Sequence, residues 1–182
     1  MNSETKPLDL YEIYALVKKF HAKYKNAPIE HILLIQNDGT HVEKSGDAGS
    51  VDFTTYISKT VGGGLIHNHP NGGAFSPDDI RTCGLLQLSW MVATTKDGFY
   101  IITANNWRNY IGLYKSAVQK YKKALKDLRV NTIVQLIKHI KNGGDASSFD
   151  ENAIEEEFKK KWDKFLKHSC CLRALSFKFI PL

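Results

Sequence analysis

The chain has 182 residues, enough for one main domain with an appendage and for a real hydrophobic core. Hydrophobic residues make up 42% of it, which excludes wholesale disorder, and no apolar run reaches the roughly 18 residues of a membrane span. The N-terminus lacks the layout of a signal peptide, and three cysteines, two of them adjacent, make a poor disulfide framework. We therefore expect a cytoplasmic protein with no membrane partner.

The net charge of +6 is distributed unevenly along the chain. Residues 1–108 carry 10 Lys and Arg against 11 Asp and Glu, a net of −1. Residues 109–182 carry 15 against 8, a net of +7. This asymmetry predicts two parts, a domain over 1–108 and a basic extension over 109–182.

Helix and strand signals alternate over the first part of the chain, whereas residues 52–60 are ambiguous. The patterns first predict a helix over 9–25 capped by Asp9, followed by a strand over 29–36, a turn at 37–39 and a returning strand over 40–44. They next predict a short buried strand at Leu65 and Ile66 and a helix from Ser76 and Pro77 to about Leu88. A hairpin of WMVATT and FYIIT, with its turn at Lys96 to Gly98, follows.

The last third of the chain has a mostly helical pattern. Apolar stripes at helical spacing begin at Leu113, Val130 and Ile154, a linker covers 142–148, and the tail ALSFKFIPL alternates like a strand. The predicted fold class is α/β (α+β): a mixed sheet flanked by helices, followed by a basic, mostly helical extension.

The stretch HNHPNGGAFSPDD, residues 67–79, concentrates residue types that bind metals. His67 and His69 share one face if they lie on a strand, and Asp79 falls in the first turn of the following helix. Two imidazoles and one carboxylate are the ligand set of a catalytic zinc whose fourth position is left for water. Zinc lowers the pKa of that water to about 7 and can polarise a carbonyl.

Each residue of this stretch also has a structural explanation. Ser76 to Asp79 forms an S-x-x-D helix-capping signature, and Pro70 with the glycines can make a turn. These explanations take the residues one at a time. A bound metal also explains why they all occur within 13 positions.

The stretch resembles the metal motif of the JAB/MPN (JAMM) metallopeptidase superfamily, in which a distant Glu precedes H-x-H and S-x-x-D. Its HNHP form is similar to the RadC-like branch. The wider stretch VGGGLIHNHPNGGAFSPDDI, with TKDGFYIIT downstream, is similar to JAB-like domains attached to phage morphogenesis proteins and bacterial toxins. The resemblance covers roughly residues 26–107 and implies a JAB/MPN-like sheet.

The resemblance implies a role for each residue of the site. His67, His69 and Asp79 would hold one zinc per chain. Ser76 would help hold the tetrahedral oxyanion, and Glu30, at the start of the first core strand, would be the general base that activates the water. The implied activity is that of a zinc-dependent peptidase or isopeptidase. Its substrate would be a protein or peptide, with a conjugate of a ubiquitin-like modifier among the options.

Alternatives stay open at several points. The loop before Ser76 is one residue shorter than the usual family spacing, so Asp78 is a second candidate ligand, and Glu43 is a second candidate base. The domain can also be a non-catalytic scaffold. Clustered lysines and aromatic residues over 115–167 fit contact with nucleic acid or an acidic partner, but they also fit a solvated helix face or a cover over the site.

Overall fold

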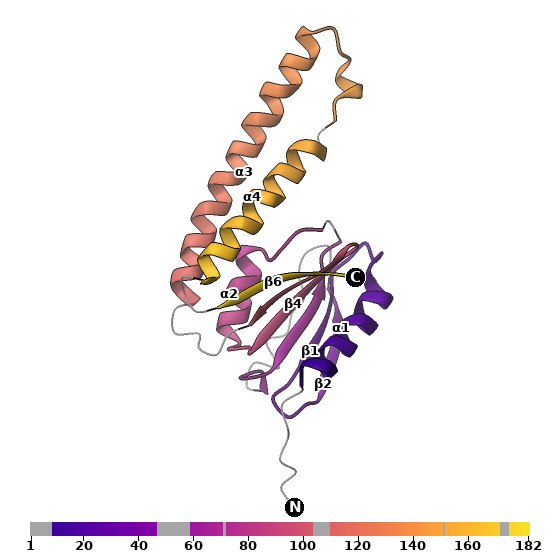
Figure 1. Ribbon diagram of the computed structural model, residues 1–182, viewed down its shortest axis with the longest axis vertical. Helices are drawn as coiled ribbons and strands as arrows, with labels where there is room; N and C mark the ends of the chain where they lie inside the picture. Colours follow the sequence, from indigo (N-terminus) through magenta and orange to yellow (C-terminus); the bar gives the residue numbers. More distant parts are fainter. Residues whose placement is uncertain (1–8, 47–58, 71, 104–109, 151, 172–174) are drawn as a thin grey trace, which may run out of the picture.

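The computed structural model describes residues 9–46, 59–70, 72–103, 110–150, 152–171 and 175–182. Within them, six strands form one sheet in the order β2-β1-β3-β4-β5-β6 (Figure 1). The strands are β1 (His31–Ile35), β2 (His41–Ser45), β3 (Gly64–Asn68), β4 (Trp90–Thr95), β5 (Gly98–Thr103) and β6 (Ser176–Pro181). The helices are α1 (Leu10–Tyr24), α2 (Pro77–Leu85), α3 (Tyr110–Lys141) and α4 (Asn152–Cys171), with a short 3-10 helix, η2 (Ala146–Ser148), between the last two.

Neighbouring strands of the sheet are antiparallel except for β3 and β4, which are parallel. This arrangement confirms the predicted mixed sheet flanked by helices. The predicted ambiguity over 52–60 falls almost wholly outside the described residues.

The sheet separates two hydrophobic cores, because successive side chains of a strand point to opposite faces. Leu33, Ile66 and Val92 lie on one face and pack beneath α1. Leu34 and Leu65 lie on the other face, where the core is completed by α2, the first turns of α3 and the last turns of α4. Figure 1 shows α1 and α2 on opposite sides of the sheet.

The predicted first helix and the predicted start of α2 are both confirmed. Asp9 and Glu12 form a capping box at α1, and Ser76 and Asp79 form one at α2. The α2 helix ends at Leu85, earlier than the predicted end near Leu88. The reason is that Gln87 adopts a positive φ of 51° and turns the chain out of the helix.

The chain after residue 108 contributes to the same sheet and to the same core. β6 pairs antiparallel with β5, so the strand-like tail closes one edge of the sheet. Leu113 of α3 and Leu166 of α4 are buried in the cluster that contains Leu34 of β1. The division at 108/109 stays a prediction, and the sheet and one core run across it.

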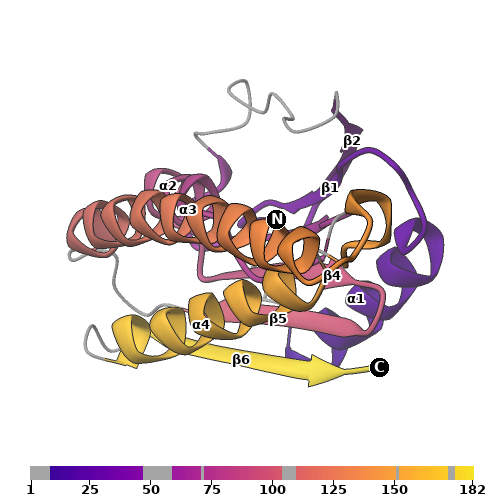
Figure 2. The same ribbon diagram turned by 90° about the horizontal axis from the view of Figure 1, so that it is seen from above.

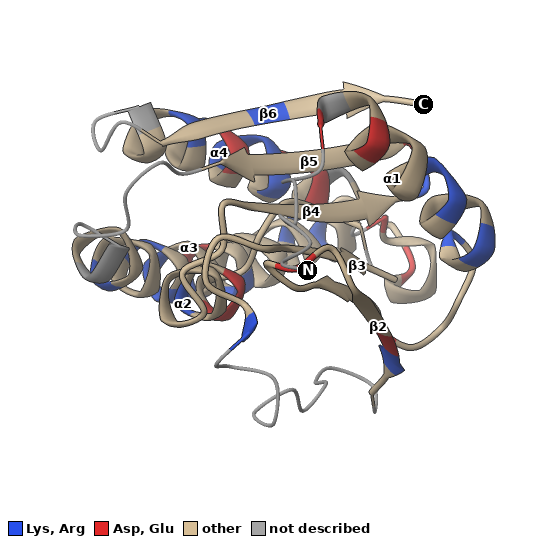
Figure 3. Ribbon diagram, turned by 90° about the horizontal axis from the view of Figure 1, so that it is seen from below, with Lys and Arg blue, Asp and Glu red and all other residues tan. Residues whose placement is uncertain are grey.

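Helices α3 and α4 form a hairpin whose far end projects beyond the sheet (Figure 1), and α4 lies between α3 and β6 (Figure 2). The first two predicted apolar stripes belong to one continuous helix of 32 residues. Lys and Arg are spread over α1, α3, α4 and β6 (Figure 3). Among the described residues, no helix has both the length and the apolar character that crossing a membrane requires.

Candidate metal centre

His67 is held in the middle of the sheet. It pairs with Ile32 on β1 and with Ala93 on β4, and only 1% of it is exposed. The Thr94 hydroxyl donates to the His67 carbonyl at 3.3 Å. Strand alternation places the imidazole on the face covered by α2, α3 and α4, opposite Ile66 and α1. The ring therefore projects from a rigid, buried strand.

His69 lies just past the end of β3 and keeps the direction of the strand. Its backbone N–H donates to the Thr94 carbonyl at 2.8 Å, so its ring emerges on the same side as that of His67. His69 Nδ1 lies 3.0 Å from the Gly73 carbonyl oxygen. A carbonyl only accepts, so Nδ1 carries the proton and Nε2 keeps the lone pair that a metal needs.

The Gly73 carbonyl reaches the ring because the loop turns back at two glycines. Gly72 and Gly73 have positive φ angles of 70° and 91°, a region that other residues rarely adopt. The Gly72 N–H donates to the His69 carbonyl at 3.0 Å, which closes the turn. The predicted role of the glycines in a turn is confirmed, and this turn also orients an imidazole.

Asp79 is fixed by the capping box of α2. Its Oδ2 accepts from the Ser76 N–H at 2.6 Å, and its own N–H donates to Ser76 Oγ at 3.1 Å. The carboxylate is thereby held at the positive end of the helix, facing β3. The two interpretations of S-x-x-D, as a helix cap and as a source of a metal ligand, are therefore compatible, since one carboxylate can serve in both roles.

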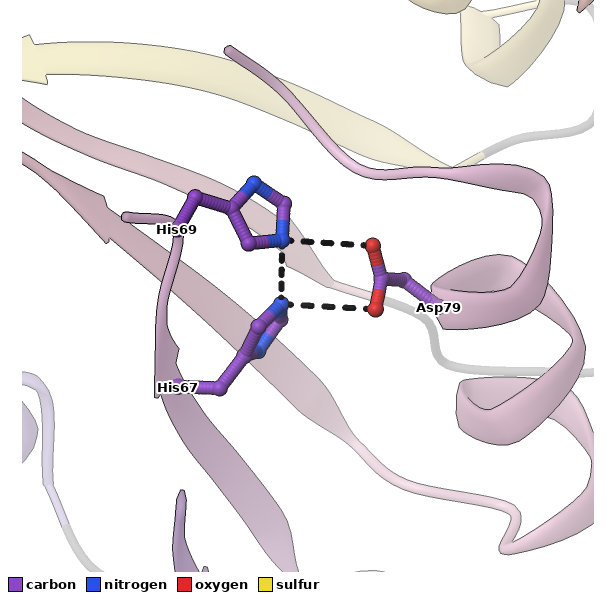
Figure 4. A group of neighbouring side chains, drawn as sticks. All are labelled: His67, His69 and Asp79. Atoms are coloured by element: carbon purple, nitrogen blue, oxygen red, sulfur yellow. Dashed lines mark hydrogen bonds and ion pairs between the residues drawn. The ribbon is translucent and has the colours of Figure 1, made fainter. Parts of the chain in front are cut away.

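Figure 4 shows how the three side chains converge. The two Nε2 atoms are 2.8 Å apart, and each lies 3.4 Å from one oxygen of the Asp79 carboxylate. One potential ligand atom from each residue lies within 4.8 Å of the others. The shortened loop still brings Asp79 to both histidines, whereas Asp78 is exposed and lies outside the group. These three residues, called the metal group below, can hold a metal ion.

The electrostatics of the group favour an anionic Asp79 beside its histidines. Burial alone would raise the pKa of Asp79, but the charges and hydrogen bonds of His67 and His69 hold it well below its usual range. Burial alone would likewise lower the pKa of His69. The Asp79 carboxylate outweighs it, with smaller contributions from the Gly73 carbonyl and Glu30, so the pKa of His69 is raised.

Glu30 lies directly before β1, on the side of the sheet that carries the metal group. Its carbonyl accepts from the Gly46 N–H at 3.0 Å, which extends the β1–β2 pairing by one residue. Alternation then places its side chain on the face of Ile32, the partner of His67. The contribution of Glu30 to the raised pKa of His69 agrees with this orientation.

Asn68, between the two histidines, ties the segment around Glu30 to β3. Its Oδ1 accepts from the His31 N–H at 2.6 Å, and its Nδ2 donates to the Ile29 carbonyl at 3.0 Å. The side chain is 2% exposed. The backbone on both sides of Glu30 is thus hydrogen-bonded to the strand that carries the ligands. The sequence did not predict this role of Asn68, because its hydrogen-bond partners lie 37 and 39 residues away along the chain.

Glu43, the second candidate base, lies on the other side of the sheet. It pairs with Leu33, whose side chain packs under α1. Its Oε1 accepts hydrogen bonds from Lys23 Nζ at 2.6 Å and from the Tyr24 hydroxyl. The structure therefore brings Glu30, and not Glu43, to the face of the metal group.

A cavity of about 310 Å³ adjoins the metal group. His69 and Ser76 line one side of it. The other side is formed by Tyr121 of α3 and by Phe158 and Trp162 of α4. The sequence analysis left a cover over the site as one option for this part of the chain but did not single out these three residues, because periodicity does not say which loop a helix face will meet.

Comparisons with known proteins do not add to this geometry. A scan against protein-family models, a search of curated proteins and a search of solved structures each gave no significant match. The residues of the site and their arrangement are therefore the basis on which a function can be assigned.

Proposed function

We propose that the protein is a zinc-dependent amide hydrolase, a peptidase or isopeptidase of the JAB/MPN type. The observation that carries the proposal is the convergence of His67, His69 and Asp79 beside a cavity. Two imidazoles and one carboxylate, with room for a further ligand, are typical of catalytic zinc. When bound, zinc polarises a substrate carbonyl and lowers the pKa of a water molecule to about 7.

In this proposal, Glu30 moves the protons. Its carboxylate, on the face of His67, accepts a proton from the attacking water and passes it to the leaving amine nitrogen. The side chain is half-buried, and Asn68 holds the backbone on both sides of it. A base anchored in this way keeps its distance from the reacting atoms from one turnover to the next.

Ser76 supports the oxyanion in the same scheme. Its Oγ accepts from the Asp79 N–H, which leaves the hydroxyl hydrogen available as a donor. The residue lines the cavity together with His69. A donor fixed beside the developing negative charge stabilises the transition state without further reorganisation.

The test of this function is a screen of amide and isopeptide substrates with zinc-loaded wild type and Glu30→Gln. The variant should keep its zinc and its fold, and hydrolysis should fall by about two to four orders of magnitude, the range for losing a general base. Glu43→Gln is the matched control, since Glu43 lies on the α1 face, and its rate should equal that of wild type. Equal rates in wild type and Glu30→Gln would contradict the assignment.

Two other functions compete with hydrolysis and predict different results. A non-catalytic scaffold predicts that no amide substrate is cleaved by zinc-loaded wild type. Nucleic-acid binding through 115–167 predicts an affinity that falls steeply as salt concentration rises.

A further inference from the structure

The cavity beside the metal group has two chemically different sides. His69 and Ser76 form the polar side, and Tyr121, Phe158 and Trp162 form an aromatic wall. Its volume of about 310 Å³ lies at the lower end of the range for small-ligand pockets. A group that reaches the metal from this side therefore places its neighbouring atoms against aromatic rings.

The aromatic wall is built as a unit and is anchored to the metal loop. The Tyr121 ring lies edge-on to Trp162 and Phe158, with centroid distances of 4.9 Å and 5.7 Å. The Trp162 Nε1–H donates to the Phe75 carbonyl at 2.9 Å, a buried bond that joins α4 to the chain just before Ser76. The wall is thus preformed, and its distance from the metal residues is fixed by a direct contact.

The two charged residues that line the cavity have opposite charges. Lys159 and Glu155 also line it. Lys159 Nζ is paired with Glu156 Oε1 at 3.1 Å, which offsets its charge. Burial and the nearby Asp79 carboxylate raise the pKa of Tyr121, so its phenol stays neutral. The wall therefore offers apolar surface more than it offers charge.

We infer that this cavity is the specificity pocket of the enzyme and that it takes a bulky apolar side chain, preferably an aromatic one, next to the amide that is cleaved. The inference rests on the proposed zinc-dependent hydrolysis and adds a class of substrate to it. It also gives the basic extension a role, since α3 and α4 supply the wall. Aromatic rings prefer edge-on or offset contacts with other rings, and the wall presents three.

Two hydroxamic acids test the pocket without any knowledge of the substrate. Acetohydroxamic acid and phenylacetohydroxamic acid share one metal-binding group and differ in a methyl against a benzyl group. Dissociation constants are measured by calorimetry on zinc-loaded and zinc-free protein. Zinc-loaded wild type should bind the benzyl compound about tenfold more tightly or better, because only that compound buries a ring on the wall.

Three variants assign that preference to the pocket. Phe158→Ala should reduce it to about twofold while the affinity for acetohydroxamic acid stays within about twofold of wild type. Phe158→Leu keeps apolar volume and should give an intermediate preference. Phe179→Ala is the matched control, because Phe179 is an exposed aromatic residue on β6 outside this cavity, and it should behave as wild type.

The outcomes separate the pocket from the proposed function. Equal affinities of zinc-loaded wild type for the two compounds would overturn the pocket and leave the metal centre standing. An unchanged preference in folded Phe158→Ala and Phe158→Leu would do the same. A folded wild type that binds no zinc would overturn the proposed function and the pocket together.

Discussion

At the scale of single residues, the site depends on side chains that hold other residues in place. Asp79 is both part of the capping box of α2 and a candidate ligand, and the Gly73 carbonyl sets the protonation of the His69 ring. Asn68 is not a member of the metal group, but its side chain hydrogen-bonds to the backbone on both sides of Glu30. Substitutions of such residues should separate metal binding from turnover.

Asn68→Ala should keep zinc and lose activity. The substitution removes two part-buried hydrogen bonds, which lowers the free energy of unfolding by about 1–3 kcal/mol. It also frees the chain around Glu30, and a displacement of about 1 Å can lower a rate on the order of 100-fold. Zinc stoichiometry, urea unfolding and kcat against KM on one substrate check this, with the loss expected in kcat. Asn142→Ala, at the exposed end of α3, is the control.

A wild-type kcat in Asn68→Ala would show that Asn68 has no role in positioning Glu30. Loss of zinc from a folded Asn68→Ala would show instead that Asn68 supports metal binding, which would contradict the expected separation of metal binding from turnover.

The raised pKa of His69 predicts how metal-free stability depends on pH. A raised folded-state pKa contributes stability that is fully present below the unfolded value near 6.5 and is lost as the pH rises through the folded value. Asp79, whose pKa is depressed, stays ionised over this window. Metal-free wild type should therefore exceed Asp79→Asn in stability by more at pH 5.5 than at pH 8. Urea unfolding at both pH values checks this, and a larger difference at pH 8 would contradict it.

At the scale of elements, local patterns predicted most of the architecture but not where each element ends or what it meets. The Asp9 cap, the turn at 37–39 and the alternation of the tail each depend on near neighbours, and each is confirmed. The predicted end of α2, near Leu88, was wrong by a few residues, because the positive φ of Gln87 has no sequence signature of its own. Periodicity marked Val130 to Ile140 as one face of a helix, but those side chains are exposed.

The residues of the candidate site also fall into those that spacing along the chain predicts and those that it does not. His67, His69, Ser76 and Asp79 lie close in sequence, so spacing alone could bring them together. The contact of Asn68 with Ile29 spans 39 residues, and that of Trp162 with Phe75 spans 87. Such contacts depend on the tertiary fold, which spacing along the chain does not reveal.

The turn at Gly72 and Gly73 gives a prediction at this scale. Gly73→Ala places a side chain at a φ of +91°, which the turn can relieve only by moving the Gly73 carbonyl away from His69 Nδ1. Loss of such a support of a metal ligand weakens metal affinity by about 10–100-fold. Gly39→Ala, in the β1–β2 turn at a φ of +77°, is a matched control with similar backbone strain far from the metal.

Competition of each protein with a zinc-binding dye measures this difference. Gly39→Ala should lose stability but bind zinc as tightly as wild type. Equal zinc affinities of the two glycine variants would show that the Gly73 carbonyl does not support His69.

At the scale of the whole molecule, the basic extension over 109–182 belongs to the same sheet and the same core as the first part of the chain. It supplies β6 to the sheet, two helices to one core and the aromatic wall to the cavity beside the metal group. The charge asymmetry that predicted two parts describes the surface of these helices, whereas their inner faces join the same core as β1 and β3. The aromatic wall on α3 and α4 is therefore joined to the loop of the metal group by a direct contact, the hydrogen bond from Trp162 to the Phe75 carbonyl.

The most direct test of this account is the zinc content of the purified, folded protein, measured by elemental analysis. Wild type should hold about one zinc per chain, and His67→Ala and His69→Ala should lose most of it. Asp78→Ala should keep it, because Asp78 is exposed and lies outside the group. Circular dichroism confirms that each variant is folded. Full zinc retention in both histidine variants, or a folded wild type that binds no zinc, would contradict the metal centre and the function built on it.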